Sequence, residues 1–439
     1  MSLLFVGTYG EKLGHVDGKG KGLYVLRFSH STLSLTDGND DALMGKPQLG
    51  TQIKNSTYMV AHRGANSELT LYIVDERNDG PGAVNAARVN ESTGELQLLG
   101  DAVPALKPSD MRAAACCHVA VSPGGTHVLA ANYLAGSVCA IPRRDDGSLD
   151  GASTQYVDFP PSSHPITYPG PNVGRQDASH AHMVVFSIGS ASTSVLVPDL
   201  GSDTVWSIPF DPTNREAPLG APVATAVHPS LAGGGPRHLA MHPTERVAYV
   251  GYELSSQAAA FGVDEQTGAI VGQPLCVCNV LCGVASPFLS GEAAEGGAEA
   301  YAGFLQDNTN EGVATLKEGH GRFVSSDQKT SIAAVRVAPG AGHLLVSSRI
   351  VKAPGAISAI PLTTAGLFVD DDTKQPIRIT SSIGVTPRDF NILVDSAQSV
   401  HALVANQDDD KIVVLRNGHE ATLLTESVPT PVCLCWTPP

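Results

Sequence analysis

Two apolar strands joined by a short polar turn recur seven times along this chain. The clearest copies are CHVAVSPGGTHVLAANY, which starts at Cys117, and RHLAMHPTERVAYVGY, which starts at Arg237. Such self-similarity is typical of repeat proteins, because each unit buries its apolar faces against its neighbours. The residue that closes the second strand of each copy falls, in chain order, at Thr8, Asp75, Asn132, Asp199, Tyr252, Ser348 and Asn406.

Most copies continue into a turn such as DDGSL or QTGAI and then a further strand, and helical periodicity is nearly absent. Seven such units predict an all-β, seven-bladed β-propeller with four-stranded antiparallel blades. We expect a single domain over residues 1–439, closed by pairing of LLFVGTY near the start with PVCLCW near the end. The 96 residues from Tyr252 to Ser348 are predicted to include a loop insertion at about 283–322, the least ordered part of the chain.

Composition limits the partners of this fold. The formal net charge of −15 argues against a nucleic-acid or anionic-membrane partner. No run reaches the ~18 apolar residues of a membrane helix, and MSLLFVGTYG lacks the basic region of a secretory signal, so a cytoplasmic location is the expectation. Cys276, Cys278 and Cys282 do not have zinc-finger spacing, and no metal site is expected. The oligomeric state is left open.

Equivalent positions of propeller blades form rings around the central channel, so residues distant in sequence become neighbours. One place after the closing residue of each second strand come Tyr9, Glu76, Tyr133, Leu200, Glu253, Arg349 and Gln407. Glu253 and Arg349 are charged residues at apolar strand ends, which turn formation does not explain. We call this end of the channel the mouth.

The starts of the first strands add cationic and imidazole side chains to the same end. His118 and His238 share one repeat position, Arg237 precedes His238, and His182 and Arg388 lie near the corresponding starts of two other copies. The sequence therefore predicts a cationic mouth in an anionic protein, which is typical of an anion-binding pocket. The loop GGGP (233–236) is predicted to deliver Arg237 to that anion.

Four ordered segments resemble the seven-bladed propeller lactonase family, which includes bacterial-type 6-phosphogluconolactonases and fungal carboxy-cis,cis-muconate cyclases. They are NVGRQDASHAH (172–182), GGGPRHLAMHP (233–243) with YVGYELSS, LLVSSRI (344–350), and GVTPRDFNIL with LVANQDDDKIVVL. The resemblance covers nearly the whole chain. Ser348 stands where the family usually has Asn, and NSTYM (55–59) replaces its N-P-S, so the resemblance leaves the fine substrate selection open.

The resemblance implies a division of the site residues. It implies catalytic roles for Glu253, His182, Arg237 and Arg349. Together with the repeat positions, it implies a substrate-binding group of His118, Arg175, Gln176, His180, His238, Arg388, Asn406 and Gln407.

The activity that the resemblance implies is hydrolysis of a phosphorylated sugar lactone in the pentose phosphate pathway, without a metal or cofactor. The partner is then a small anionic lactone. The sequence contains no G-x-S-x-G, Walker A or H-E-x-x-H motif, which is consistent with a reaction that needs no covalent nucleophile. Two alternatives stay open at this point: an isomerase that opens or closes a muconate lactone, and a non-catalytic propeller that binds proteins.

Overall fold

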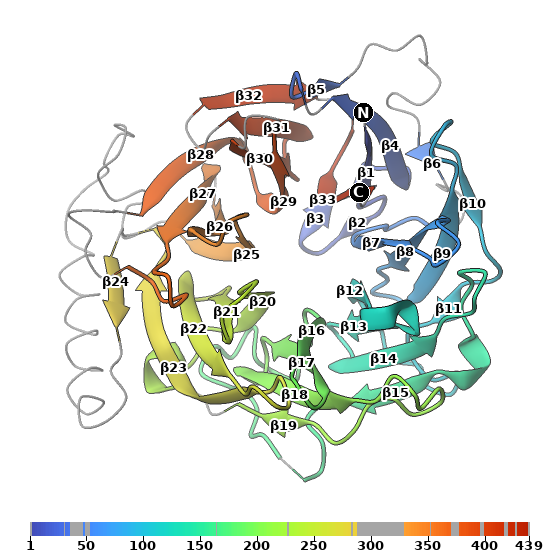
Figure 1. Cartoon of the computed structure of the whole chain (residues 1–439), viewed down its shortest axis with the longest axis horizontal. Helices are drawn as coiled ribbons and strands as arrows, with labels where there is room; N and C mark the ends of the chain where they lie inside the picture. The colour runs from blue at the N-terminus through green and yellow to red at the C-terminus, as the bar shows by residue number, and fades with distance from the viewer. Residues whose placement is uncertain are drawn as a thin grey trace.

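Seven antiparallel sheets surround a central channel in the computed structural model (Figure 1). The seven-bladed β-propeller predicted from the repeat is confirmed. The structure describes residues 2–29, 31–35, 47–48, 53–163, 165–225, 228–281, 284–287, 329–351, 353–369, 377–395, 399–416, 420–425 and 428–437. Within these ranges the helical segments are three short 3-10 turns, η1 (Pro123–Gly125), η2 (Gly151–Ser153) and η3 (Pro229–Leu231), and none could cross a membrane.

The first three sheets are given from the channel outward. The first contains β33 (Pro431–Trp436), β1 (Ser2–Thr8), β4 (Leu23–Ser29) and β5 (Ser34–Leu35), and β6 (Pro47–Gln48) pairs with β4. The second contains β7 (Met59–Arg63), β8 (Leu69–Asp75), β9 (Ala83–Val89) and β10 (Leu96–Leu98), and β11 (Val103–Pro104) pairs with β9. The third contains β12 (Cys116–Val121), β13 (His127–Asn132), β14 (Ser137–Pro142) and β15 (Gln155–Asp158).

The other four sheets follow the same plan. The fourth contains β16 (Val185–Ile188), β17 (Thr193–Asp199), β18 (Thr204–Phe210) and β19 (Val223–Ala224). The fifth contains β20 (Pro236–Met241), β21 (Val247–Tyr252), β22 (Gln257–Val263), β23 (Ile270–Asn279) and β24 (Val284–Pro287). The sixth contains β25 (Thr330–Val337), β26 (His343–Ile350), β27 (Pro354–Pro361) and β28 (Arg378–Val385). The seventh contains β29 (Pro387–Val394), β30 (Val400–Asn406), β31 (Lys411–Arg416) and β32 (Glu420–Thr425).

The core lies between neighbouring blades. The second strand of a blade is covered on both faces, which explains why β8, with the sequence LTLYIVD, is buried along its whole length. Phe5 of β1 packs with Leu71 and Ile73 of β8, so apolar side chains of the first and second blades share one cluster. Burial of these faces between blades, rather than in one central core, leaves the channel free for polar side chains.

The ring closes through the chain ends, as the sequence predicted. β33 pairs antiparallel with β1, with Leu434 opposite Val6 and Trp436 opposite Leu4. The first blade therefore takes its innermost strand from the C-terminal part of the chain, next to the inner strands β29 and β7.

The predicted insertion at 283–322 is described only at its start. Residues 284–287 form β24, a fifth strand that extends the fifth sheet by pairing with β23. The rest of the predicted insertion, and the prediction that it is poorly ordered, lie outside the described residues.

Candidate functional site

The mouth of the channel is built where the second strands of the blades end. Six of the seven predicted closing residues are the last residue of their strand: Thr8, Asp75, Asn132, Asp199, Tyr252 and Asn406. Ser348 lies two places before the end of β26. The side chains that follow these positions therefore project at one end of the channel.

A β-bulge at the start of the inner strand turns selected side chains toward this mouth. In three blades, one extra residue lies between two paired positions: Cys117 in β12, Arg237 in β20 and Arg388 in β29. A bulge leaves its extra residue out of the ladder and redirects the side chain. The residue two places before each bulged residue has a positive φ: Ala115 at 45°, Gly235 at 64° and Thr386 at 58°.

The GGGP loop (233–236) requires glycine at position 235. A Cβ atom on Gly235 would come within 2.8 Å of Leu200 Cγ and would stand at a positive φ, so this position requires glycine. The buried side of the loop is held by Asp203, whose Oδ1 accepts from the Gly235 amide at 2.8 Å. The loop thereby fixes the start of β20 and the direction of Arg237.

Glu253 lies at the centre of a cluster of three arginines in the mouth. Arg175 Nη2 donates to Glu253 Oε1 at 2.7 Å, while Arg237 Nε and Arg349 Nη2 lie 2.9 and 3.0 Å from Oε2. The Glu253 and Arg237 side chains are 4% and 3% exposed, whereas Arg175 is 43% exposed and lies on the solvent side. The anion that Arg237 meets in this structure is therefore Glu253.

Main-chain oxygens fix two of these arginines further. Arg237 Nη1 donates to the Ala333 carbonyl at 2.6 Å, and Arg349 Nη2 donates to the Ile332 carbonyl at 2.9 Å. Arg237 Nε and Arg349 Nε have no hydrogen-bond acceptor in line with their N–H bonds among the described residues, although Arg237 Nε is close to Glu253. The cluster thus retains hydrogen-bonding capacity that the described residues do not use.

Glu253 and its three arginines keep one another ionised. Burial alone would raise the pKa of Glu253, but Arg349, Arg237 and Arg175 lower it well below the usual value. Burial and the neighbouring Arg349 lower the pKa of Arg237 to about 10, against the opposing effect of Glu253, so the guanidinium remains charged at neutral pH.

Three buried histidines line the channel beside this cluster. The ring centres of His182 and His238 are 5.8 Å apart, and those of His118 and His238 are 6.1 Å apart. Burial, together with Arg237, lowers the pKa of each, to about 3 for His118. They are therefore neutral, and His118 Nε2 and His238 Nδ1 are buried without a hydrogen-bond partner in the described structure.

A second polar cluster lies on the opposite part of the mouth. The Tyr9 hydroxyl donates to the Glu76 carboxylate, at 2.9 and 3.0 Å from its two oxygens, and accepts from Arg388 Nη2 at 2.8 Å. Thr57 Oγ1 donates to the same carboxylate at 2.6 Å. The ring prediction placed Tyr9 and Glu76 at the mouth, but only the structure reveals their link to Arg388.

The other predicted binding residues are engaged with the protein. His180 contacts the Tyr133 carbonyl and Asp177 through its two ring nitrogens and stacks on the Tyr133 ring at 4.4 Å. Gln176 binds main-chain groups at both ends of its amide. In contrast, Asn406 Oδ1 and Gln407 Oε1 are buried oxygens without a donor among the described residues.

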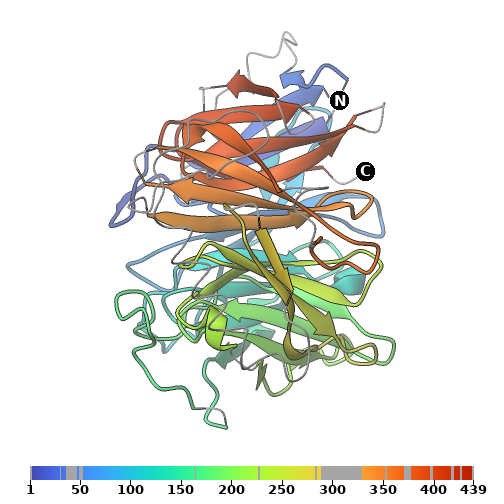
Figure 2. The same ribbon diagram turned by 90° about the vertical axis from the view of Figure 1, so that its left-hand side faces the viewer.

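Tyr9, Glu76, Tyr133 and His15 contribute to the mouth but were not among the predicted site residues. Tyr133 accepts a hydrogen bond from Arg175 at 3.1 Å, and its place in the predicted ring was the signal for it. His15 comes from the hairpin of β2 (Lys12–Leu13) and β3 (Val16–Asp17), which lies near the channel in Figure 1. In Figure 2 the blue hairpin and the green loop around residues 160–176 project from the same face. No repeat pattern could have revealed His15, since this hairpin occurs in one blade.

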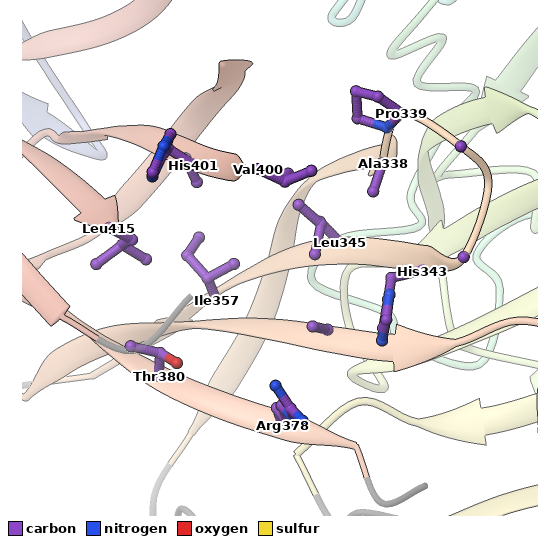
Figure 3. Close-up of a pocket in the computed structure, with 14 residues that line it drawn as sticks. Ala338, Pro339, His343, Leu345, Ile357, Arg378, Thr380, Val400, His401 and Leu415 are labelled. Atoms are coloured by element: carbon purple, nitrogen blue, oxygen red, sulfur yellow. The ribbon is translucent and has the colours of Figure 1, made fainter. Parts of the chain in front are cut away.

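A cavity of about 390 Å³ lies elsewhere, between the sixth and seventh blades (Figure 3). It includes His343 at the start of β26, whereas Arg349 of the mouth is near the end of that strand. The cavity therefore opens at the opposite face, and its floor is largely apolar, with Leu345, Ile357 and Leu415. Across the described ranges, no three His, Cys, Asp or Glu side chains are grouped as metal ligands.

Sequence comparison finds relatives of this chain among known proteins. Residues 3–274 match the family described as "Lactonase, 7-bladed beta-propeller". A 6-phosphogluconolactonase of Bacillus subtilis (strain 168) is 28% identical over 264 residues, which cover 60% of this chain and 63% of that protein. An uncharacterized protein of Staphylococcus aureus (strain N315) is 27% identical over 256 residues, covering 57% and 61%. The match thus spans less than two thirds of these curated relatives.

Solved structures are similar over almost the full length. The periplasmic gluconolactonase PpgL of Pseudomonas aeruginosa superposes with a TM-score of 0.69 at 23% identity, covering 99% of this chain and 98% of that one. A protein from Lactobacillus plantarum gives a TM-score of 0.65, also at 23% identity, with 99% of each chain covered. At these identities the likeness concerns the fold alone.

Proposed function

The chain belongs to the seven-bladed β-propeller lactonase family, and from this premise we propose that it hydrolyses a lactone carrying an anionic group, with 6-phosphoglucono-δ-lactone as the first candidate. The observation that carries the proposal is the simultaneous contact of Glu253 with Arg175, Arg237 and Arg349. A buried carboxylate needs one cation for neutrality, so this cluster has positive charge in excess.

The excess charge suits a phosphorylated substrate. The Glu253 cluster and the Tyr9–Glu76 cluster together contain four guanidinium groups, those of Arg175, Arg237, Arg349 and Arg388, and two carboxylates, those of Glu76 and Glu253. The formal surplus of two positive charges equals the charge of a phosphate monoester dianion. A net charge of −15 on the whole chain makes this local surplus a specific feature of the site.

Lactone opening needs a water nucleophile and a stabilised oxyanion. We assign the oxyanion to Arg237 and Arg349, which are fixed by main-chain oxygens and carry Nε groups without an aligned acceptor. Fixed donors that need no reorganisation during the reaction contribute roughly 10²–10³ each in rate. A δ-lactone is a reactive ester, so positioning and electrostatics suffice without a covalent intermediate.

The proton transfers are assigned to His182, a neutral ring without an ion pair among the described residues, because the Glu253 carboxylate is already bound by three arginines. Neutral His182 accepts a proton from water as the water oxygen bonds to the carbonyl carbon. The ring C–O bond then breaks, and the proton passes to the ring oxygen, which becomes the hydroxyl of the open acid. Glu253 orients the water and holds the three arginines in place.

The test is a rate measurement with the purified chain on 6-phosphoglucono-δ-lactone, with the spontaneous rate subtracted and EDTA present. We expect turnover above the spontaneous rate under these conditions. A chain that leaves this lactone at its spontaneous rate but interconverts a carboxymuconate and its lactone would instead be an isomerase. Inactivity on both substrates would favour a protein-binding propeller.

A further inference from the structure

We propose that Arg388, Tyr9 and His15 form the subsite for the phosphate group of the substrate, across the mouth from the reacting centre at Glu253. This inference rests on the proposed lactonase function and assigns the substrate's two ends to two separate clusters. The reacting carbonyl lies at Arg237 and Arg349, and the phosphate lies at Arg388.

Arg388 is the arginine of the mouth whose charge is not paired. Arg175, Arg237 and Arg349 each form an ion pair with Glu253, whereas Arg388 forms none with any carboxylate in the described part of the chain. Its partner is the neutral Tyr9 phenol, which accepts from Nη2 at 2.8 Å. Burial lowers the pKa of Arg388, but Tyr9, Glu76 and Glu253 raise it above its usual value, so the charge is retained.

Tyr9 and Glu76 position this arginine. The Tyr9 side chain is fully buried, and its hydroxyl proton is directed at the Glu76 carboxylate, which Thr57 also binds. The hydroxyl oxygen can then only accept, which fixes the Arg388 guanidinium, with its central carbon 5.1 Å from the Tyr9 ring centre. A guanidinium fixed in this way presents its remaining N–H groups in a planar fork suited to phosphate oxygens.

His15 reaches the same place from the β2–β3 hairpin. Its Nε2 is 3.3 Å from the Tyr9 hydroxyl, and its outer side is exposed to solvent. The charged groups that face it are Arg388 of β29, Arg349 of β26, Arg175 of the 165–180 loop, and Glu253 after β21. Burial and the three arginines lower the pKa of His15 to about 4, so it is neutral in the free protein.

A phosphate dianion bound beside Arg388 opposes the positive potential that the arginines produce at His15. The negative charge raises the pKa of His15, so phosphate binding takes up protons at pH values between the pKa of the free protein and the raised pKa. Phosphate affinity therefore falls as the pH rises through that value, and this coupling is absent when His15 is replaced by Gln.

The experiment compares kcat/KM for 6-phosphoglucono-δ-lactone and for unphosphorylated glucono-δ-lactone. Arg388→Met is expected to lower the ratio of the two by roughly 10- to 100-fold, the effect of losing charge-assisted hydrogen bonds. Arg388→Lys should restore part of the ratio, and Tyr9→Phe should lower it less than Arg388→Met. Arg144→Met is the matched control, since Arg144 is an exposed arginine of the opposite face paired with Asp150, and it should leave the ratio unchanged.

Calorimetric titration with 6-phosphogluconate and with inorganic phosphate separates the subsite from the activity. Wild-type protein should bind both, and Arg388→Met should bind both at least 10-fold more weakly. In two buffers of different ionisation enthalpy, wild type should take up more protons than His15→Gln at pH 5–6. Unchanged selectivity and unchanged phosphate binding in a folded Arg388→Met protein would overturn the subsite. Normal phosphate binding by a wild-type chain that hydrolyses neither lactone would instead overturn the proposed function and leave the subsite supported.

Discussion

Glu253 links the fifth blade, the sixth blade and the loop before the fourth blade through one carboxylate. It follows β21 in the fifth blade and binds Arg349 of the sixth blade, Arg237 of its own blade and Arg175 of the loop before the fourth. In a buried cluster of this kind, removing the central charge leaves the surrounding charges without compensation. Glu253 is therefore expected to matter for stability as well as for turnover.

Glu253→Gln should lower the free energy of unfolding by about 3–5 kcal/mol, because it leaves the buried Arg237 unpaired. Urea denaturation at pH 7 measures this loss. The matched control is Glu91→Gln, which removes the exposed pair with Arg63 and should cost less than about 1 kcal/mol. Equal, small losses in the two variants would show that the Glu253 cluster contributes no more than a surface pair.

The buried histidines predict how stability depends on pH. His118, His182 and His238 have pKa values lowered by burial, so the unfolded chain binds protons near pH 6.5 that the folded chain rejects. Stability is then complete above pH 6.5 and is lost as the pH falls toward the folded pKa values. Urea titrations from pH 7 to 4.5, above the range of most carboxyl groups, should show this decline, and His118→Gln should reduce it. A stability that stays flat or rises over this range would contradict the neutral, buried state of these rings.

Strand ends and bulges, more than individual side chains, determine which residues meet. The repeat allowed the ends of β1, β8, β13, β17, β21 and β30 to be located from the sequence, because strand periodicity and turn residues are local signals. For Glu253, the sequence predicted only that it shares a ring of equivalent blade positions with Arg349. It did not predict the ion pairs. The bulges that redirect Arg237 and Arg388 depend on register between strands, and the sequence does not reveal such register.

The cluster of Tyr9, Glu76 and Arg388 illustrates why the contacts within the mouth could not be predicted from the sequence. Tyr9 and Glu76 are 67 residues apart, and Arg388 is 379 residues from Tyr9. Their contact depends on closure of the ring, which brings the seventh blade against the first. His15 depends on a hairpin that no other blade repeats. Such contacts follow from side-chain packing across blades rather than from any periodic pattern.

The GGGP loop gives a test at the start of β20. Gly235→Ala should destabilise the chain by more than Gly124→Ala, because Gly235 combines a φ of +64° with a Cβ contact of 2.8 Å, while Gly124 has a φ of +80° and open space. We expect about 1 kcal/mol for Gly124→Ala and at least 2–3 kcal/mol for Gly235→Ala. Thermal melting and lactonase rates measure both effects, and only Gly235→Ala should also lower turnover by redirecting Arg237. Indistinguishable variants would mean that the loop does not control the site.

The whole molecule is held as a ring by one blade that draws on both ends of the chain. Removal of residues 431–439 deletes β33, whose Val432, Cys433 and Leu434 are at most 3% exposed. The first blade would lose its innermost strand and β1 would have an exposed edge. We expect the shortened chain to lose its cooperative melting transition in circular dichroism. A wild-type transition in this variant would show that closure through β33 is dispensable.

The ring also brings the arginines of the mouth together in an anionic molecule. We propose that these arginines support the hydrolysis of a lactone. The most direct measurement is the initial rate on 6-phosphoglucono-δ-lactone at pH 7, with EDTA present, for wild type, Arg349→Met and Arg144→Met alongside the spontaneous reaction. We predict catalysis by wild type, an equal rate for Arg144→Met, and a decrease of roughly 10²–10³ in kcat for folded Arg349→Met. Wild-type protein at the spontaneous rate, or Arg349→Met with an undiminished rate, would contradict it.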